Sequence, residues 1–137
     1  MKKIIILFLL LSSCTGTGSK IMPSVNHSIK KNMSELYFAR SKSLIGGGVV
    51  ADITVNGKQV GKLGVGEFLK YEISPGTYSI LVEGDSLNRL LMSSADFRGK
   101  IKEGERMFFL IEYEYNFLLH SFSILKTSVR TFENLSK

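Results

Sequence analysis

The chain has 137 residues, which is enough for one compact domain and too few for two. Its content of 44% hydrophobic, 22% charged and 10% aromatic residues is typical of a globular protein and excludes a disordered one. Removing Lys2 and Lys3, which lie in a segment predicted below to be cleaved, leaves 16 basic against 12 acidic side chains, a net charge of +4. This excess is not gathered into a basic stripe with aromatic residues between the charges, so we expect no nucleic-acid partner.

The first 13 residues have the pattern of a signal peptide. Lys2 and Lys3 form a charged start, and residues 4–11 form an apolar run of Ile, Leu and Phe. Eight residues reach only about 12 Å as a helix, whereas about 20 are needed to cross the hydrocarbon core of a membrane. Small residues, Ser12 and Ser13, follow the apolar run, as they do before a cleavage site. We therefore predict a cleaved signal peptide over residues 1–13.

The single cysteine, Cys14, stands directly behind this segment. Leu11-Ser12-Ser13-Cys14 resembles the lipobox of bacterial lipoproteins, which implies that the thiol receives a diacylglyceryl group and becomes the first residue of the mature chain. The alternative is a secretory peptide followed by an incidental cysteine, but there is no second cysteine for a disulfide. We expect a membrane anchor on Cys14, because two or three acyl chains hold a protein firmly. By the same resemblance, Thr15 in place of Asp favours the outer membrane over the inner, with the protein on its periplasmic face or the cell surface.

Residues 14–33 are predicted to form the lipidated cysteine and a flexible linker. They are rich in Ser, Thr, Gly, Asn and Lys, contain Pro23, and lack a hydrophobic period. About 19 residues of such chain reach roughly 25 Å. Lys20, Lys30 and Lys31 could contact anionic headgroups, but a solvated linker explains them better. His27 has no Cys, Asp or second His near it in the sequence, so we expect no metal and no cofactor.

The remainder, residues 34–137, is predicted to be one β-sandwich domain, because its hydrophobic pattern repeats every two residues. The tail at residues 128–135 has apolar residues three apart and predicts one or two helical turns. We find no helical patterns between strands, which excludes an α/β fold. The fold expected is all-β, an immunoglobulin-like or transthyretin-like antiparallel sandwich of about six to eight strands. The expected strands are 35–40, 49–55, 58–63, 67–73, 78–83, one within 90–101, 106–115 and 118–125.

Two turns are marked by their residues. Asn56-Gly57 predicts a two-residue hairpin, because a type I′ turn needs positive φ at both central positions. Ser74-Pro75-Gly76-Thr77 predicts a type II turn, after which residues 78–83 run back.

Several motifs in the middle of the chain occur in an order that resembles a small bacterial lipoprotein family. That family is a domain of unknown function close in pattern to PEGA-type surface modules. The resemblance covers about residues 34–115, implies an immunoglobulin-like or transthyretin-like sandwich, and supplies no catalytic residues. The motifs that carry it are Leu36-Tyr37-Phe38, Val55-Asn56-Gly57-Lys58, Val60-Gly61-Lys62-Leu63, Gly66-Glu67-Phe68, Ser74-Pro75-Gly76-Thr77-Tyr78 and the run from Gly104 to Phe109.

A partner surface is expected where glycines or aromatic residues are free of the core. Gly46, Gly47 and Gly48 indicate a flexible loop tip that can contact a partner. Clustered aromatic side chains on the surface, beside polar residues, suggest a platform for a protein or a glycan, but packing in the core is the favoured explanation for them. The aromatic candidates are Tyr71, Tyr113, Tyr115 and Phe117.

Nucleotide binding and catalysis have weak support. Residues 61–66 contain three glycines and Lys62, but their order differs from that of a phosphate loop and a strand follows, so no nucleotide is expected. Glu112 and Glu114 share a strand face, and His120 lies in the next strand, which makes them the candidates for a small hydrolase. A solvated face and a packed histidine explain them better.

Three functions are therefore distinguished. The favoured one is a lipid-anchored, non-catalytic envelope module that binds a protein or a glycan. The second is a structural subunit of an envelope assembly, joined by strand pairing at a sheet edge. The third is the small hydrolase.

Overall fold

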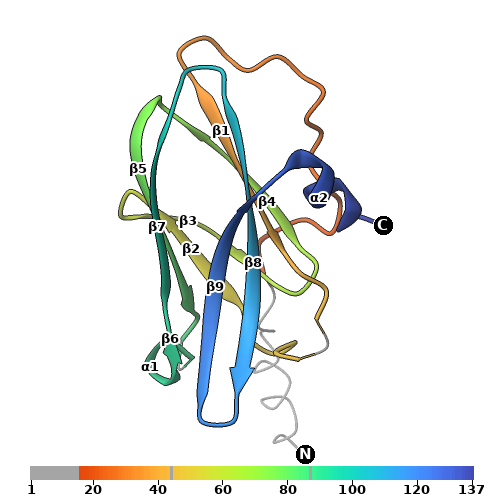
Figure 1. Cartoon of the computed structure of the whole chain (residues 1–137), viewed down its shortest axis with the longest axis vertical. Helices are drawn as coiled ribbons and strands as arrows, with labels where there is room; N and C mark the ends of the chain where they lie inside the picture. Colours follow the sequence, from red (N-terminus) through yellow and green to blue (C-terminus); the bar gives the residue numbers. More distant parts are fainter. Residues whose placement is uncertain (1–15, 44, 87) are drawn as a thin grey trace, which may run out of the picture.

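The protein is described by a computed structural model over residues 16–43, 45–86 and 88–137. The predicted signal peptide and Cys14 lie outside the described residues. Two β-sheets pack face to face, as Figure 1 shows, and the expected all-β sandwich is thereby confirmed. Within the described ranges, no helix is long and apolar enough to span a bilayer.

The first sheet has five strands in the order β4-β1-β8-β9-β6, and the second has four in the order β3-β2-β5-β7. The first comprises β1 Ser34–Arg40, β4 Phe68–Ile73, β6 Met92–Ser93, β8 Arg106–Asn116 and β9 Leu119–Thr127. The second comprises β2 Ala51–Val55, β3 Lys58–Leu63, β5 Gly76–Gly84 and β7 Ala95–Ile101. Two short helices, α1 Asn88–Leu91 and α2 Val129–Asn134, complete the described chain. The long strands and the C-terminal helix match the predicted segments, whereas α1 and β6 were not predicted.

The two predicted turns have different outcomes. Asn56 and Gly57 have φ of 50° and 78° and join β2 to β3 in an antiparallel pair, so the predicted hairpin is confirmed. Gly76 also has a positive φ, of 135°, but the strands on either side of Pro75 do not pair. The chain crosses there from β4 in the first sheet to β5 in the second. A turn motif determines only local geometry, so it could not show which sheet receives the next strand.

Most neighbouring strands are antiparallel, as expected, but β1 and β8 lie parallel at the centre of the first sheet. Their register joins Glu35 to Arg106 and Arg40 to Ile111. About 70 residues separate these positions in the chain, and alternation within a strand contains no information on such distant pairing.

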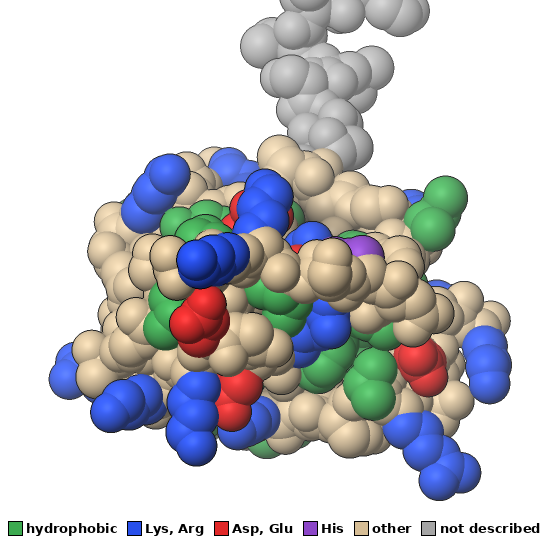
Figure 2. Space-filling view, turned by 90° about the horizontal axis from the view of Figure 1, so that it is seen from above, with side chains coloured by type: hydrophobic (Ala, Val, Ile, Leu, Met, Phe, Trp, Pro, Cys, Tyr) green, Lys and Arg blue, Asp and Glu red, His purple; other side chains and the backbone are tan. Residues whose placement is uncertain are grey.

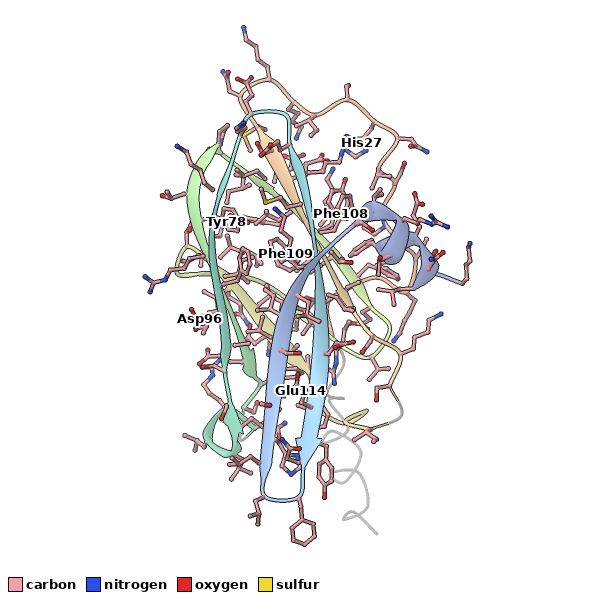
Figure 3. The ribbon with its side chains drawn as sticks, viewed as in Figure 1. His27, Tyr78, Asp96, Phe108, Phe109 and Glu114 are labelled. Carbon is pink, nitrogen blue, oxygen red and sulfur yellow. The ribbon has the colours of Figure 1, made fainter. Side chains whose placement is uncertain are left out.

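The main core lies between the sheets and is built on aromatic side chains. Phe109 of β8 lies 5.7 Å from Phe38, 5.0 Å from Phe97 and 6.3 Å from Tyr78, measured between ring centroids. In Figure 3, Phe109 points toward the Tyr78 side, whereas Phe108 lies on the side of α2. The alternation of β8 therefore supplies both faces of the first sheet with a buried ring.

A second core covers the outer face of the first sheet. Tyr37 is stacked on Phe108 at 5.0 Å and meets the edge of Phe132, which α2 provides. Ser128 caps this helix by accepting a hydrogen bond from the Thr131 amide. Because both faces of β1 are covered, all seven of its residues are buried.

The described part of the predicted linker, residues 16–33, also packs on the domain, where it is hydrogen-bonded to edge strands of both sheets, and we call it the N-terminal arm. Thr17 N donates to Lys62 O at 2.8 Å, and Ser19 N donates to Phe68 O at 2.9 Å. Met22 and Val25 pack against the second core. The expected flexible reach of 25 Å therefore does not apply to residues 16–33.

The glycines of the arm lie where a side chain would clash with the domain, which the composition of residues 14–33 does not indicate. A Cβ at Gly18 would lie 2.8 Å from Leu63 Cδ2 and 2.9 Å from Phe68 O, so a larger residue would push the arm off β3 and β4. Polar and glycine-rich sequence is typical of linkers, but here glycine permits close packing.

Candidate functional site

The β8–β9 hairpin ends in two strongly exposed apolar side chains. Asn116 pairs with Leu119, which leaves Phe117 and Leu118 as the turn, with exposed fractions of 91% and 84%. Turns of this length are usually built from Gly, Asn or Asp, so the turn itself gives no reason for Phe and Leu. Their exposure indicates a role outside the fold.

A second segment extends this apolar surface. β6 runs parallel to β9 with Met92 opposite His120, which brings the preceding Leu90 and Leu91 alongside the hairpin turn. Leu90 is 84% exposed and Leu91 is 73% exposed. Figure 1 shows α1, β6 and the hairpin turn gathered at one end of the molecule. We call this surface the apolar end; it comprises Leu90, Leu91, Tyr115, Phe117, Leu118 and Leu119.

A polar base supports the apolar end. Tyr113 Oη is hydrogen-bonded to His120 Nδ1, and the rings of Tyr115 and His120 meet edge to face at 4.9 Å. Tyr113 also lies beside Phe122 of the main core. The hairpin is therefore braced at its base, and its turn projects from a supported structure.

The predicted partner residues fall into two groups. Gly46 lies against the Tyr113 ring, so the glycine loop, Tyr113, Tyr115 and Phe117 lie at the same end of the first sheet. Gly47 and Gly48 are exposed. Tyr71 is elsewhere, on β4, where it packs against the main core.

Arg40 fixes the loop that contains these glycines. Its guanidinium is buried, donates to Gly46 O at 2.9 Å and Leu63 O at 3.1 Å, and also reaches Val49 O. It also lies 5.2 Å from the Phe122 ring centroid. Burial lowers the pKa of Arg40 below its ordinary value. Because backbone carbonyls are its acceptors, Arg40 holds the loop in place, and residues 46–48 are less free than their composition suggested.

The hydrolase candidates do not share one face. His120 lies opposite Tyr115, on the side of Tyr113 and the main core. Glu112 and Glu114 alternate with Tyr113 along β8 and therefore point to the other side of the sheet. The three side chains form no common site, and the described residues contain no group of three or more potential metal ligands.

A buried carboxylate, which the sequence did not single out, lies under the arm. Glu35 is 2% exposed, and its Oε1 lies 2.7 Å from both His27 Nε2 and Lys70 Nζ. Its Oε2 accepts hydrogen bonds from Arg106 Nε and Tyr37 Oη, both at 2.8 Å. Burial by itself raises the pKa of Glu35, but these hydrogen bonds outweigh burial and lower the pKa to about 2.

The same cluster holds the arm in place. Arg106 also donates through Nη2 to the carbonyl of His27. The arm is therefore hydrogen-bonded both to Glu35 and to Arg106, the cation that pairs with Glu35. Burial, together with donation to Glu35, raises the pKa of Tyr37 to about 12, so this hydroxyl stays protonated and donating. Each of the four groups around Glu35 reaches one of its oxygens, so the carboxylate is satisfied within the fold, which is what a structural cluster requires. His27 has no potential metal ligand near it in the sequence, but in the fold its side chain pairs with Glu35.

The family comparison covers most of the domain. A family described as "Protein of unknown function (DUF2846)" matches residues 30–118, a range that includes β1 through β8 and the hairpin turn. A search of curated proteins found no match.

Proposed function

The chain belongs to the DUF2846 family, whose function is unknown, and we propose that it is a lipid-anchored, non-catalytic lipoprotein of the bacterial cell envelope that acts as an interaction module. The observation that carries this proposal is the order of a charged start, a short apolar run, two serines and the only cysteine at residues 1–14. The lipobox and the PEGA-like pattern belong to the proposal as resemblances. So does the preference for the outer membrane, which depends on Thr15 following Cys14.

The domain's surface supports an interaction role more than a catalytic one. Its hydrolase candidates face opposite sides of a sheet, whereas six exposed apolar and aromatic side chains gather at one end. Exposed apolar clusters of this kind mark contact surfaces. The proposed partners are the membrane, through the lipid on Cys14, and an envelope protein or glycan at the exposed loops.

Strand pairing with a neighbouring subunit is the second candidate. Among the described strands, β7 pairs with β5 alone and so has an open edge, whereas the arm covers part of β3 and β4. However, β7 carries exposed Asp96, Arg98 and Lys100 at alternate positions. Charges on an edge strand are a usual protection against pairing, which favours the interaction module over the assembly subunit.

Replacing Cys14 with Ser tests the anchor. We expect Cys14→Ser to abolish incorporation of radioactive or clickable fatty acid and to move the protein from the detergent phase to the aqueous phase. Ser13→Ala is the matched control, because it keeps a small residue before the cysteine and should retain both properties. Full acyl labelling of Cys14→Ser would refute the proposal.

In-cell crosslinking separates the two interaction hypotheses. A module that binds another component should yield a mixed product of defined mass, and an assembly subunit should yield a ladder of its own multiples. Recovery of monomer alone would remove the support for an assembly.

A further inference from the structure

The arm meets the sheets level with the end of β1 that lies nearer the apolar end, because Ser19 is hydrogen-bonded to Phe68, which pairs with Ala39. Thr17 is bonded to Lys62, one residue from the end of β3, and Ser19 is bonded to Phe68, the first residue of β4. The end of β3 is level with the end of β5, because Leu63 and Gly84 both pair with Ala51. Helix α1 and its exposed leucines follow directly after β5.

This entry point limits where a lipid on Cys14 can lie. Cys14 stands two positions before Gly16, and an extended residue spans at most about 3.5 Å, so Cys14 lies within roughly 7 Å of Gly16. Because residues 17–19 are hydrogen-bonded to β3 and β4, the arm does not increase the distance that Cys14 can reach from the domain. The membrane that holds the lipid is therefore close to this end of the sandwich.

The apolar end projects toward the same side. β8 continues for five residues from Ile111, which is level with the end of β1, to Asn116, a distance of about 17 Å at the usual rise. Residues 115–125 contain no Asp, Glu, Lys or Arg. Figure 2 looks onto the opposite end, where Lys and Arg side chains project around the margin with acidic side chains between them.

We propose that the apolar end inserts into the interfacial layer of the bilayer that holds the lipid of Cys14, so that the domain is docked on the membrane in a fixed orientation. This inference rests on the proposed lipid anchor. Phe117 and Leu118 enter the acyl boundary, Leu90 and Leu91 lie beside them, and Tyr115 and His120 stay at the level of the headgroups. Rings with both an apolar face and a polar group, tyrosine above all, favour that level.

The shape and charge of the surface select a lipid layer as its occupant. The hairpin turn is a projection rather than a groove, and a projection of uncharged side chains fits a fluid layer without a complementary pocket. A second copy of the chain would need to offer such a pocket. The position of the anchor on the same end adds the independent reason for a membrane.

The chain has no tryptophan, so a single introduced tryptophan reports on its own position. The test places Phe117→Trp or Leu118→Trp in the lipidated protein, reconstituted in phosphatidylethanolamine–phosphatidylglycerol vesicles with brominated acyl chains. Both positions are highly exposed, so neither substitution should disturb folding. Ser74→Trp is the control, since Ser74 is exposed and follows Ile73, at the opposite end of β1. We expect blue-shifted emission and strong bromine quenching at positions 117 and 118, and neither at position 74.

The outcomes separate this inference from the anchor. Mass spectrometry of the same sample reports whether Cys14 is acylated, and an unmodified cysteine would refute the anchor. The Phe117→Trp variant that also carries Cys14→Ser tests the apolar end without the anchor, and we expect its emission to be quenched by brominated chains at excess lipid. An acylated Phe117→Trp protein with unquenched emission would overturn the docking proposal and leave the anchor standing. A blue shift in the emission of the Phe117→Trp protein that grows with protein concentration in the absence of lipid would also overturn the docking proposal. The apolar end would then be covered by a second copy of the chain.

Discussion

Glu35 shows how one buried charge can hold a terminal segment on a domain. Its two carboxylate oxygens receive His27 from the arm, Lys70 from β4, and Tyr37 and Arg106 from neighbouring strands. The desolvation cost of burying the carboxylate is offset only because each lone pair has a donor. Glu35 could not be predicted as a site residue from the sequence, because a charge within an aromatic strand is typical of a solvent-facing position unless the covering arm is known.

Removing this charge should destabilise the domain strongly. We expect Glu35→Gln to lower the free energy of unfolding by about 3 kcal/mol, because it leaves the partly buried cations of Lys70 and Arg106 without their counter-ion. The matched control is Glu72→Gln, since Glu72 forms an exposed pair with Lys30 at 2.9 Å, and exposed pairs contribute about 0–1 kcal/mol. Urea unfolding measures both values. Equal losses of unfolding free energy in the two variants would show that the Glu35 cluster stabilises the fold no more than an exposed ion pair does.

The lowered pKa of Glu35 also predicts the acid sensitivity of the fold. The pKa falls from 4.5 in the unfolded chain to about 2 in the folded one, so the unfolded chain binds the proton more readily. The stabilisation from this group is therefore full above about pH 4.5 and is lost as the pH falls toward 2. Unfolding free energy measured from pH 6 to pH 2 should decline less steeply in Glu35→Gln than in the unchanged protein. Parallel curves would contradict this assignment.

At the scale of elements, the arm is the feature that most changes the expected organisation. Residues 16–33 were expected to be a spacer, but they form hydrogen bonds along β3 and β4 and cover part of the second core. Most strands were predictable, because alternating burial, as in β5 and β7, is a local property of seven to nine residues. The pairing of β1 with β8, the sheet crossing at Pro75 and the docking of the arm were not, because each depends on partners far along the chain.

Gly18 tests whether the arm needs close packing. We expect Gly18→Ala to destabilise the fold by about 1–3 kcal/mol, because its Cβ would meet Leu63 and the Phe68 carbonyl. Hydrogen exchange at the Ser19 and Phe68 amides, which bond across this contact, should become faster. Gly48→Ala is the control, since a Cβ there has no neighbour within 4 Å. Unchanged exchange in Gly18→Ala would mean that the arm is held elsewhere.

At the scale of the whole molecule, the proposed anchor and the apolar end act on the same side. The candidate surface was only partly predictable from the sequence. Tyr115 and Phe117 are among the aromatic residues predicted as a possible partner surface, and they are exposed. Leu90, Leu91 and Leu118 were not selected, because exposed leucines look like core residues until the register of β6 and the hairpin turn is known. Tyr71 was selected and instead packs against the core.

The mature N-terminus tests the central claim most directly. Mass spectrometry of the N-terminal peptide from the protein purified from its native membrane should find a chain that begins at Cys14 and carries a diacylglyceryl group on the sulfur. An N-terminal peptide that begins at another residue, or that begins at Cys14 with a free thiol, would contradict the lipoprotein account.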